Sequence, residues 1–176
     1  MEKITHDELK AAQEIVYRHL KPTPEILWPL LSVRCGCEVW VKHENHTLIG
    51  AFKVRGGLNY MDRLSREQPD INGIISATRG NHGQSLAFAA SRYGITATIL
   101  VPFGNNPEKN DAMRALGAEL IEYGEDFQEA REYAEVLSGE KNLHMIGPFH
   151  PWLLQGVGTY ALEFFTACRD LDVVYV

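Results

Sequence analysis

Short apolar runs alternate with amphipathic segments through the middle of this 176-residue chain. The runs at 73–77, 97–101, 119–123 and 143–146 are rich in aliphatic residues and predict buried strands. Between them, apolar residues recur every three to four positions and predict helices over 81–93, 108–116 and 126–137. Buried strands joined by helical crossovers are typical of a parallel sheet. The pattern therefore predicts an α/β fold.

The flanking segments follow a different order. Helical spacing predicts an amphipathic helix over 6–19, and a strand is expected at 38–42 after a proline-containing stop. A second helix is predicted over 52–67. After the α/β section, a helix is expected over 152–168, and it leads into an apolar run at 172–176 that predicts a buried strand.

Composition narrows the class of protein. With 45% hydrophobic and 23% charged residues the chain can bury a core. Its formal charge of −6 argues against binding to nucleic acid or to a membrane surface, which needs clustered basic residues. We find no apolar run of about 18 residues and no signal peptide, and we therefore expect a cytoplasmic protein. The three cysteines lack zinc-ligand spacing, so no metal site is expected.

The first candidate for chemistry is Lys53, within the stretch Gly50 to Gly57. A lysine in the first turn of a helix lies in the positive end of the helix field, and Arg55 adds a like charge. Both would favour a neutral, nucleophilic amine. The alternative is an ordinary solvated lysine. Gly56 and Gly57 each cost the helix about 1 kcal/mol relative to alanine. This predicts either that another group passes close to the helix backbone there or that the helix packs unusually tightly.

The second candidate is the turn Thr78-Arg79-Gly80-Asn81-His82, which follows the strand at 73–77. In α/β proteins ligands bind at the carboxyl ends of strands, where the free N–H groups of the next helix favour an anion. Gly80 would let an anion approach the backbone, and Asn81 can donate and accept hydrogen bonds. The alternatives are a plain helix cap and a histidine that is satisfied within the core.

A third motif, Gly156 to Ala161, matches the dinucleotide-binding pattern G-x-G-x-x-A. The residues before it predict a helix or turn, whereas the motif requires a preceding strand. We therefore interpret its small residues as a site of close helix packing and set an NAD-binding oxidoreductase aside.

Taken together, A-F-K-V-R-G-G, T-R-G-N-H-G-Q and Gln155 to Glu163 resemble the threonine/serine dehydratase and serine racemase branch of the fold-type-II pyridoxal-phosphate enzymes. The resemblance runs along essentially the whole chain. It implies parallel-sheet, three-layer units of the tryptophan synthase β-like architecture. It divides the chain into 1–68 in a large cofactor domain, 69–148 as a small α/β domain and 149–176 as a return into the large domain.

The resemblance also implies site roles. Lys53 would form an imine with the aldehyde of pyridoxal 5'-phosphate and remove the substrate α-proton, and Phe52 would line the cofactor ring. The substrate carboxylate would bind at a loop of five residues, in which Asn81 also reaches the phenolic oxygen of the cofactor: Thr78, Arg79, Gly80, Asn81 and His82. The implied reaction converts L-threonine, L-serine or a related 3-hydroxy amino acid to a 2-oxo acid and ammonia.

Three departures from the family pattern affect these expectations. Ala51 replaces the usual serine, and Arg79 replaces a small residue, which suggests that Arg79 reads an acidic or polar β-substituent such as that of hydroxyaspartate. The family's glycine-rich phosphate loop would follow Val176 and does not occur in this sequence. We therefore expect a fragment, with an incomplete large domain, that binds the cofactor poorly and turns over little.

Two further expectations follow from the missing part. An uncovered sheet edge and apolar surface favour a homo-oligomer or pairing with a complementary chain. Two alternatives to the dehydratase stay open, which are an amino-acid racemase and a non-catalytic interaction or regulatory domain that keeps the small-domain fold.

Overall fold

The computed structural model describes residues 3–176 and contains a four-stranded sheet in the order β5-β4-β3-β6. Every neighbouring pair in this sheet is parallel. The strands are β3 (Ile74–Ala77), β4 (Ala97–Val101), β5 (Ala118–Glu122) and β6 (His144–Met145). The α/β prediction with a parallel sheet is confirmed.

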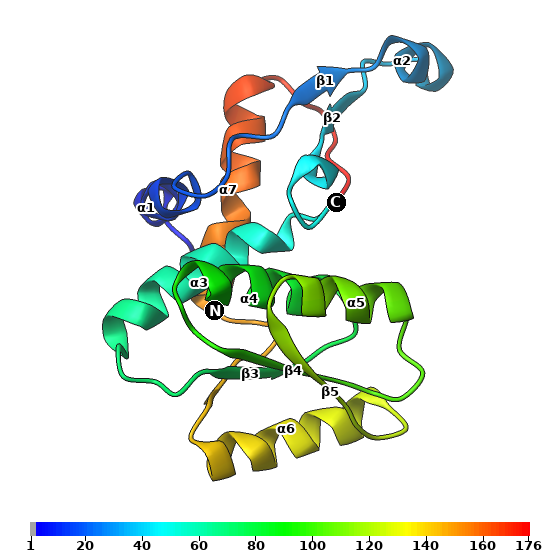
Figure 1. The fold of residues 1–176 in the computed structure, drawn as a ribbon. Helices are drawn as coiled ribbons and strands as arrows, with labels where there is room; N and C mark the ends of the chain where they lie inside the picture. The colour runs from blue at the N-terminus through cyan, green and yellow to red at the C-terminus, as the bar shows by residue number, and fades with distance from the viewer. Residues whose placement is uncertain (1–2) are drawn as a thin grey trace.

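Helices cover both faces of this sheet (Figure 1). On one face lie α3 (Lys53–Glu67), α4 (Asn81–Arg92) and α5 (Pro107–Ala115), and on the other lies α6 (Phe127–Lys141). The α6 helix continues past its predicted end at residue 137. It ends at Lys141, where the next residue, Asn142, adopts the left-handed conformation with φ of 50°. An apolar core fills each side of the sheet.

The remaining elements form a second part that extends away from the sheet (Figure 1). In it, α1 packs against α3 and α7, and β1 pairs with β2 in an antiparallel hairpin. These elements are α1 (His6–Val16), β1 (Glu25–Leu27), α2 (Pro29–Cys35), β2 (Trp40–Lys42), the 3-10 turn η1 (Glu44–His46) and α7 (Pro151–Ala167). None of the helices between residues 3 and 176 is both long and apolar enough to cross a membrane.

Glycines bring α3 into close contact with both of its neighbours. A side chain on Gly56 would lie 2.8 Å from the carbonyl oxygen of Leu153, and one on Gly156 would lie 2.8 Å from Gly56 Cα. On the other side of α3, a Cβ on Gly57 would collide with Ser85 of α4. The predicted close packing is confirmed. Because Gly156 lies inside the continuous helix α7, no strand precedes the G-x-G-x-x-A pattern.

The prediction of a buried strand at 172–176 is wrong. These residues form no strand, and Tyr175 and Val176 are 94% and 100% exposed. An apolar run becomes a strand only where a neighbouring strand satisfies its backbone groups, and no described strand pairs with this segment.

Candidate functional site

Lys53 is the first residue of α3, and the loop before it is tightly held. Thr47 Oγ1 accepts a hydrogen bond from the Ala51 amide and donates one to the Ala51 carbonyl, both at 3.0 Å. Phe52, at the N-cap, lies beside Tyr160 of α7 with 5.8 Å between the ring centroids. The Lys53 side chain is partly exposed. The backbone at Lys53 is therefore fixed while its amine can reach solvent or a ligand.

The turn after β3 carries the other predicted site residues. The Thr78 amide donates to Leu100 of β4 at 2.9 Å, and the Gly80 amide approaches Thr78 Oγ1 at 3.4 Å. The α4 helix then begins at Asn81 without a side-chain cap. Its first N–H groups consequently have no side-chain acceptor and can bind an anion. Arg79 and Asn81 are exposed at this turn, and Gly80 is buried.

One hydrogen bond joins the two stretches. Ser85, one turn into α4, donates from Oγ to the carbonyl oxygen of Lys53 at 2.6 Å. The start of α3 is thereby held against the start of α4. The structure brings together Lys53 and the turn that ends at His82, which the sequence separates by more than 20 residues.

His82 is the buried member of the turn, with 8% of its surface exposed, and its Nε2 atom is buried without a hydrogen-bond partner. The pKa of His82 is lowered to about 4, chiefly by burial and also by the charge of Lys53, while a backbone hydrogen bond with Gly147 acts in the opposite direction. The imidazole is therefore neutral near pH 7 and lies within the field of the Lys53 amine.

The sequence suggested that the positive charge of Arg55 would favour a neutral Lys53 amine. In the structure, that charge is compensated by two carboxylates. Its side chain is fully buried, and it donates to Glu44 at 2.8 and 2.9 Å and to Glu163 at 2.6 and 2.9 Å. Burial opposes the charge on Arg55, but these hydrogen bonds outweigh it and raise its pKa. For Glu163, burial opposes the charge too, yet hydrogen bonds from Arg55 and Lys42 lower its pKa.

This buried ion cluster, which we define as Arg55, Glu44, Glu163, Lys42 and Glu25, joins α3, α7 and the β1-β2 hairpin. Sequence reasoning missed it. One feature could have revealed it: Glu163 is the only charged residue in the helix expected over 152–168. A charge at a buried position needs an opposite charge elsewhere in the fold.

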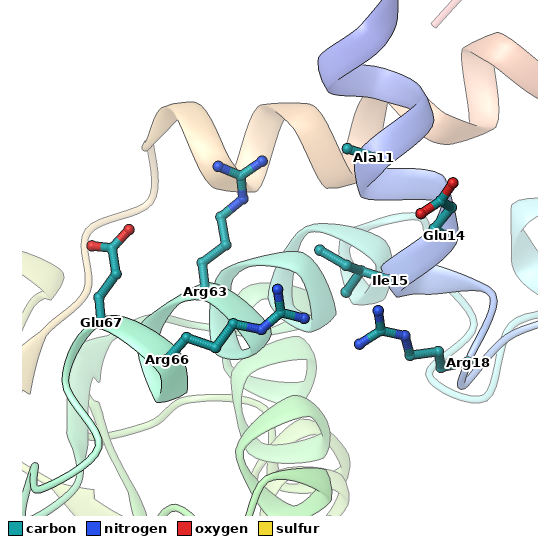
Figure 2. Close-up of a pocket in the computed structure, with 7 residues that line it drawn as sticks. All are labelled: Ala11, Glu14, Ile15, Arg18, Arg63, Arg66 and Glu67. Atoms are coloured by element: carbon teal, nitrogen blue, oxygen red, sulfur yellow. The ribbon is translucent and has the colours of Figure 1, made fainter.

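A cavity of about 360 Å³ lies away from these residues, between α1 and the far end of α3 (Figure 2). Its charged lining comprises Glu14, Arg18, Arg63, Arg66 and Glu67. Arg18 and Arg66 also share the buried carboxylate of Asp62. Because carboxylates compensate the guanidinium groups, this cavity has little preference for an anion, and it lies roughly 20 Å along α3 from Lys53.

The chain is similar to a known family of proteins over most of its length. Residues 16–176 match the family described as "Pyridoxal-phosphate dependent enzyme". The chain is 38% identical to a biosynthetic L-threonine dehydratase of Haemophilus influenzae over 162 residues, covering 92% of this chain and 31% of that protein. It is 32% identical to a serine racemase of Schizosaccharomyces pombe, covering 98% and 53%.

Solved structures show the same relationship. A processed threonine deaminase isoform 2 from Solanum lycopersicum superposes with a TM-score of 0.83 and 36% identity, covering 96% of this chain and 50% of that one. A pyridoxal 5'-phosphate-dependent aspartate racemase superposes with a TM-score of 0.90 and 29% identity, covering 98% and 54%. The chain thus spans from about a third to slightly more than half of the length of these relatives.

Proposed function

The chain belongs to the pyridoxal-phosphate-dependent enzyme family, and we propose that it carries the lysine-bearing part of an ammonia-lyase for a 3-hydroxy amino acid. Threonine, serine or a related compound would be converted to a 2-oxo acid and ammonia. The observation that carries the proposal is the 2.6 Å hydrogen bond from Ser85 to the Lys53 carbonyl. It holds the candidate lysine beside the uncapped start of α4, where a substrate carboxylate would bind.

The donor set fits the aldehyde end of pyridoxal phosphate. Within residues 3–176, the Lys53 amine forms no ion pair. The neighbouring Nε2 of His82 is a buried polar atom without a partner, as expected where a ligand completes the hydrogen bonding. We assign Lys53 to hold the cofactor aldehyde, Asn81 to its ring oxygen and Phe52 to the side of its ring.

The cofactor, when bound, supplies an electron sink for negative charge at the substrate Cα. The residues of the chain orient the substrate and move its protons. The turn from Thr78 to His82 binds the carboxylate through backbone N–H groups and thereby directs the Cα–H bond towards the Lys53 amine. That amine acts as the base that takes the α-proton. His82, being neutral near pH 7, adds no competing positive charge.

Covalent trapping tests the proposal directly. The protein is incubated with pyridoxal phosphate, treated with borohydride and digested, and the labelled peptide is identified by mass spectrometry. We expect the label on Lys53, with no label in Lys53→Ala and the wild-type level of label in Lys141→Ala, which removes an exposed lysine on the other face of the sheet. Label spread over surface lysines, or retained in Lys53→Ala, would refute the assignment.

Racemisation is the second candidate activity. The serine racemase of Schizosaccharomyces pombe aligns with 98% of this chain, and the aspartate racemase structure has a TM-score of 0.90. The two activities give different products from L-serine, since a racemase gives D-serine and an ammonia-lyase gives pyruvate. Chiral chromatography with a 2-oxo acid assay separates them. A protein with neither product and no trapped cofactor would instead support a non-catalytic interaction or regulatory domain.

We further propose that the chain works in the cytoplasm as a homo-oligomer or with a complementary chain. Leu30 and Val33 of α2 are 84% and 82% exposed, and Tyr175 is 94% exposed, so apolar surface is available for a partner. Light scattering coupled to size-exclusion chromatography measures the assembly. A monodisperse monomer at all concentrations would exclude self-association.

A further inference from the structure

Besides Arg79, a second cation, Lys109 of α5, lies close to the turn from Thr78 to His82. The helices α4 and α5 lie side by side on one face of the sheet (Figure 1). At one contact Met113 of α5 packs against Gly83 of α4, where a Cβ would collide with its sulfur. One turn earlier on α5, the Lys109 Nζ lies 3.4 Å from the position that a Cβ on Gly80 would take. The Lys109 ammonium is therefore placed against the turn itself.

The backbone around Lys109 is well anchored. Asn106 caps α5 by accepting a hydrogen bond from the Lys109 amide at 3.2 Å. The next residue, Asn110, is buried and accepts from Asn105 at 2.6 Å. Met113, packed on Gly83, also holds α5 against α4, so the backbone at Lys109 is fixed close to Gly80.

The cations at this turn have no carboxylate partner. Neither Lys109 nor Arg79 forms an ion pair with any residue from 3 to 176. On the same α5 helix, by contrast, Arg114 pairs with both Asp111 and Glu122. In a chain of net charge −6, two cations without an ion-pair partner at one turn produce a local positive field.

The same turn contains a polar atom that lacks a partner. The Nε2 atom of His82 is buried, and no group in the described chain hydrogen-bonds to it. An unpaired buried polar atom is costly, so its presence in the same turn as Arg79 and Gly80 indicates that a ligand completes the site. The uncapped N–H groups of α4 suffice for one carboxylate, which leaves Arg79 and Lys109 available for another anionic group.

We propose, on the basis of the function proposed above, that Arg79 and Lys109 together bind a second anionic group of the substrate. The substrate class is then a 3-hydroxy amino acid with an acidic side chain, such as a 3-hydroxyaspartate, in preference to threonine or serine. The planar guanidinium group of Arg79 can form two hydrogen bonds with a carboxylate. Lys109 adds a point charge from the neighbouring helix α5.

Two amino acids that differ only in the second carboxylate test the proposal. L-aspartate and L-2-aminobutyrate both lack the hydroxyl that is eliminated, so neither is dehydrated. Dissociation constants are measured with pyridoxal phosphate present, from the amide shifts of residues 78–83 in 1H–15N spectra. We expect the wild-type protein to bind aspartate about tenfold or more tightly than aminobutyrate, which corresponds to one charge-assisted hydrogen-bonded contact.

The variants assign the preference to the two residues. Arg79→Ala and Lys109→Ala should each reduce the ratio of the two constants several-fold, and the double variant should bring it close to one. Lys141→Ala, which removes an exposed lysine elsewhere, should leave the ratio unchanged. Both substituted side chains are exposed, so folding should be preserved.

Three outcomes would overturn the inference. They are equal constants in the wild-type protein, variants that weaken both ligands equally, and a ratio as low in Lys141→Ala as in Lys109→Ala. Borohydride trapping separates this failure from failure of the proposed function. If Lys53 is labelled but aspartate is not preferred, only the substrate class is wrong; if Lys53 is not labelled, the proposed function is wrong as well.

Discussion

Arg55 of α3 and Glu163 of α7 form a bidentate ion pair across 108 residues of sequence, and their side chains are 0% and 4% exposed. Arg55 lies two residues after the candidate lysine. The pair therefore fixes the first turn of α3 relative to α7 and, through Glu44 and Lys42, relative to the β1-β2 hairpin. The position of Lys53 thus depends on residues from both ends of the chain.

Removing one member of this pair should strongly destabilise the fold. In Glu163→Ala, the buried Arg55 and Lys42 each lose a carboxylate, and we expect a loss of about 3–5 kcal/mol in the free energy of unfolding. Urea denaturation followed by circular dichroism measures it. Glu135→Ala is the control, because its pair with Arg131 is 52% exposed on both sides and should contribute at most about 0.5 kcal/mol. Similar losses in the two variants would contradict a special role for Glu163.

The crossing of α3 and α7 should not tolerate a methyl group. In Gly56→Ala the new Cβ would lie 2.8 Å from the Leu153 carbonyl oxygen, so the helices must separate, and we expect a loss of roughly 1–3 kcal/mol. Gly139→Ala in α6 meets no atom within 4 Å and should instead gain up to about 1 kcal/mol from helix propensity. Thermal unfolding of both variants is a direct comparison. A stabilised Gly56→Ala protein would show that the helices are not in contact there.

Stability should fall in acid because of His82. Its pKa is lowered from 6.5 to about 4 in the folded protein, so the unfolded chain binds more protons between these values. The stability that the neutral imidazole confers is complete above about pH 6.5 and is lost progressively as the pH falls to about 4, by on the order of 3 kcal/mol.

Urea midpoints measured from pH 7 to pH 4 check this expectation. His82→Asn removes this titrating group and should reduce the dependence of stability on pH in this window, whatever its effect at pH 7. Burial also lowers the pKa of His19, His144 and His150, so part of the slope should remain. His6→Asn, at an exposed position, should reproduce the wild-type slope. Equal slopes for His82→Asn and the wild-type protein would count against a neutral buried imidazole.

Two serines of α4 offer a matched test of the link between helices. Ser85 donates to Lys53 of α3 at 2.6 Å, whereas Ser91 donates to Phe88 of its own helix at 2.7 Å. Ser85→Ala should cost about 1 kcal/mol and reduce the labelling of Lys53 by pyridoxal phosphate and borohydride. Ser91→Ala should leave labelling unchanged. Equal labelling in the two variants would show that the hydrogen bond does not position Lys53.

Local patterns predicted much of the fold. The strands β3 and β4 are short and are buried on both faces, so each appears in the sequence as a short apolar run. The predicted bounds of both strands agree with the observed ones to within one residue. The run at 172–176 is also short and rich in apolar residues, yet it forms no strand. Strand formation also depends on a neighbouring strand, which the run itself does not specify. Composition alone cannot distinguish these two cases.

The candidate site was less accessible to sequence reasoning. Lys53 and the Thr78–His82 turn each occupy the start of a helix, a local feature that capping and glycine patterns indicate. Their contact through Ser85, the partners of Arg55 and the placement of Lys109 over Gly80 all depend on how helices pack. These contacts join residues that are far apart in the sequence, and the spacing of apolar residues along the chain does not indicate which of them meet.

The glycine crossing also has a consequence for the order in which the chain assembles during synthesis. Gly56 and Gly57 weaken α3 as an isolated helix by about 1 kcal/mol each, and Arg55 has no carboxylate from α7 until Glu163 has left the ribosome. The four strands of the sheet and the helices α4, α5 and α6 all lie between residues 73 and 146, so they can fold before α7 is made. We expect nascent chains stalled before α7 to be cut by protease near Lys53 and protected within the sheet. The start of α3, which carries the candidate lysine, would then be one of the last parts of the molecule to become ordered.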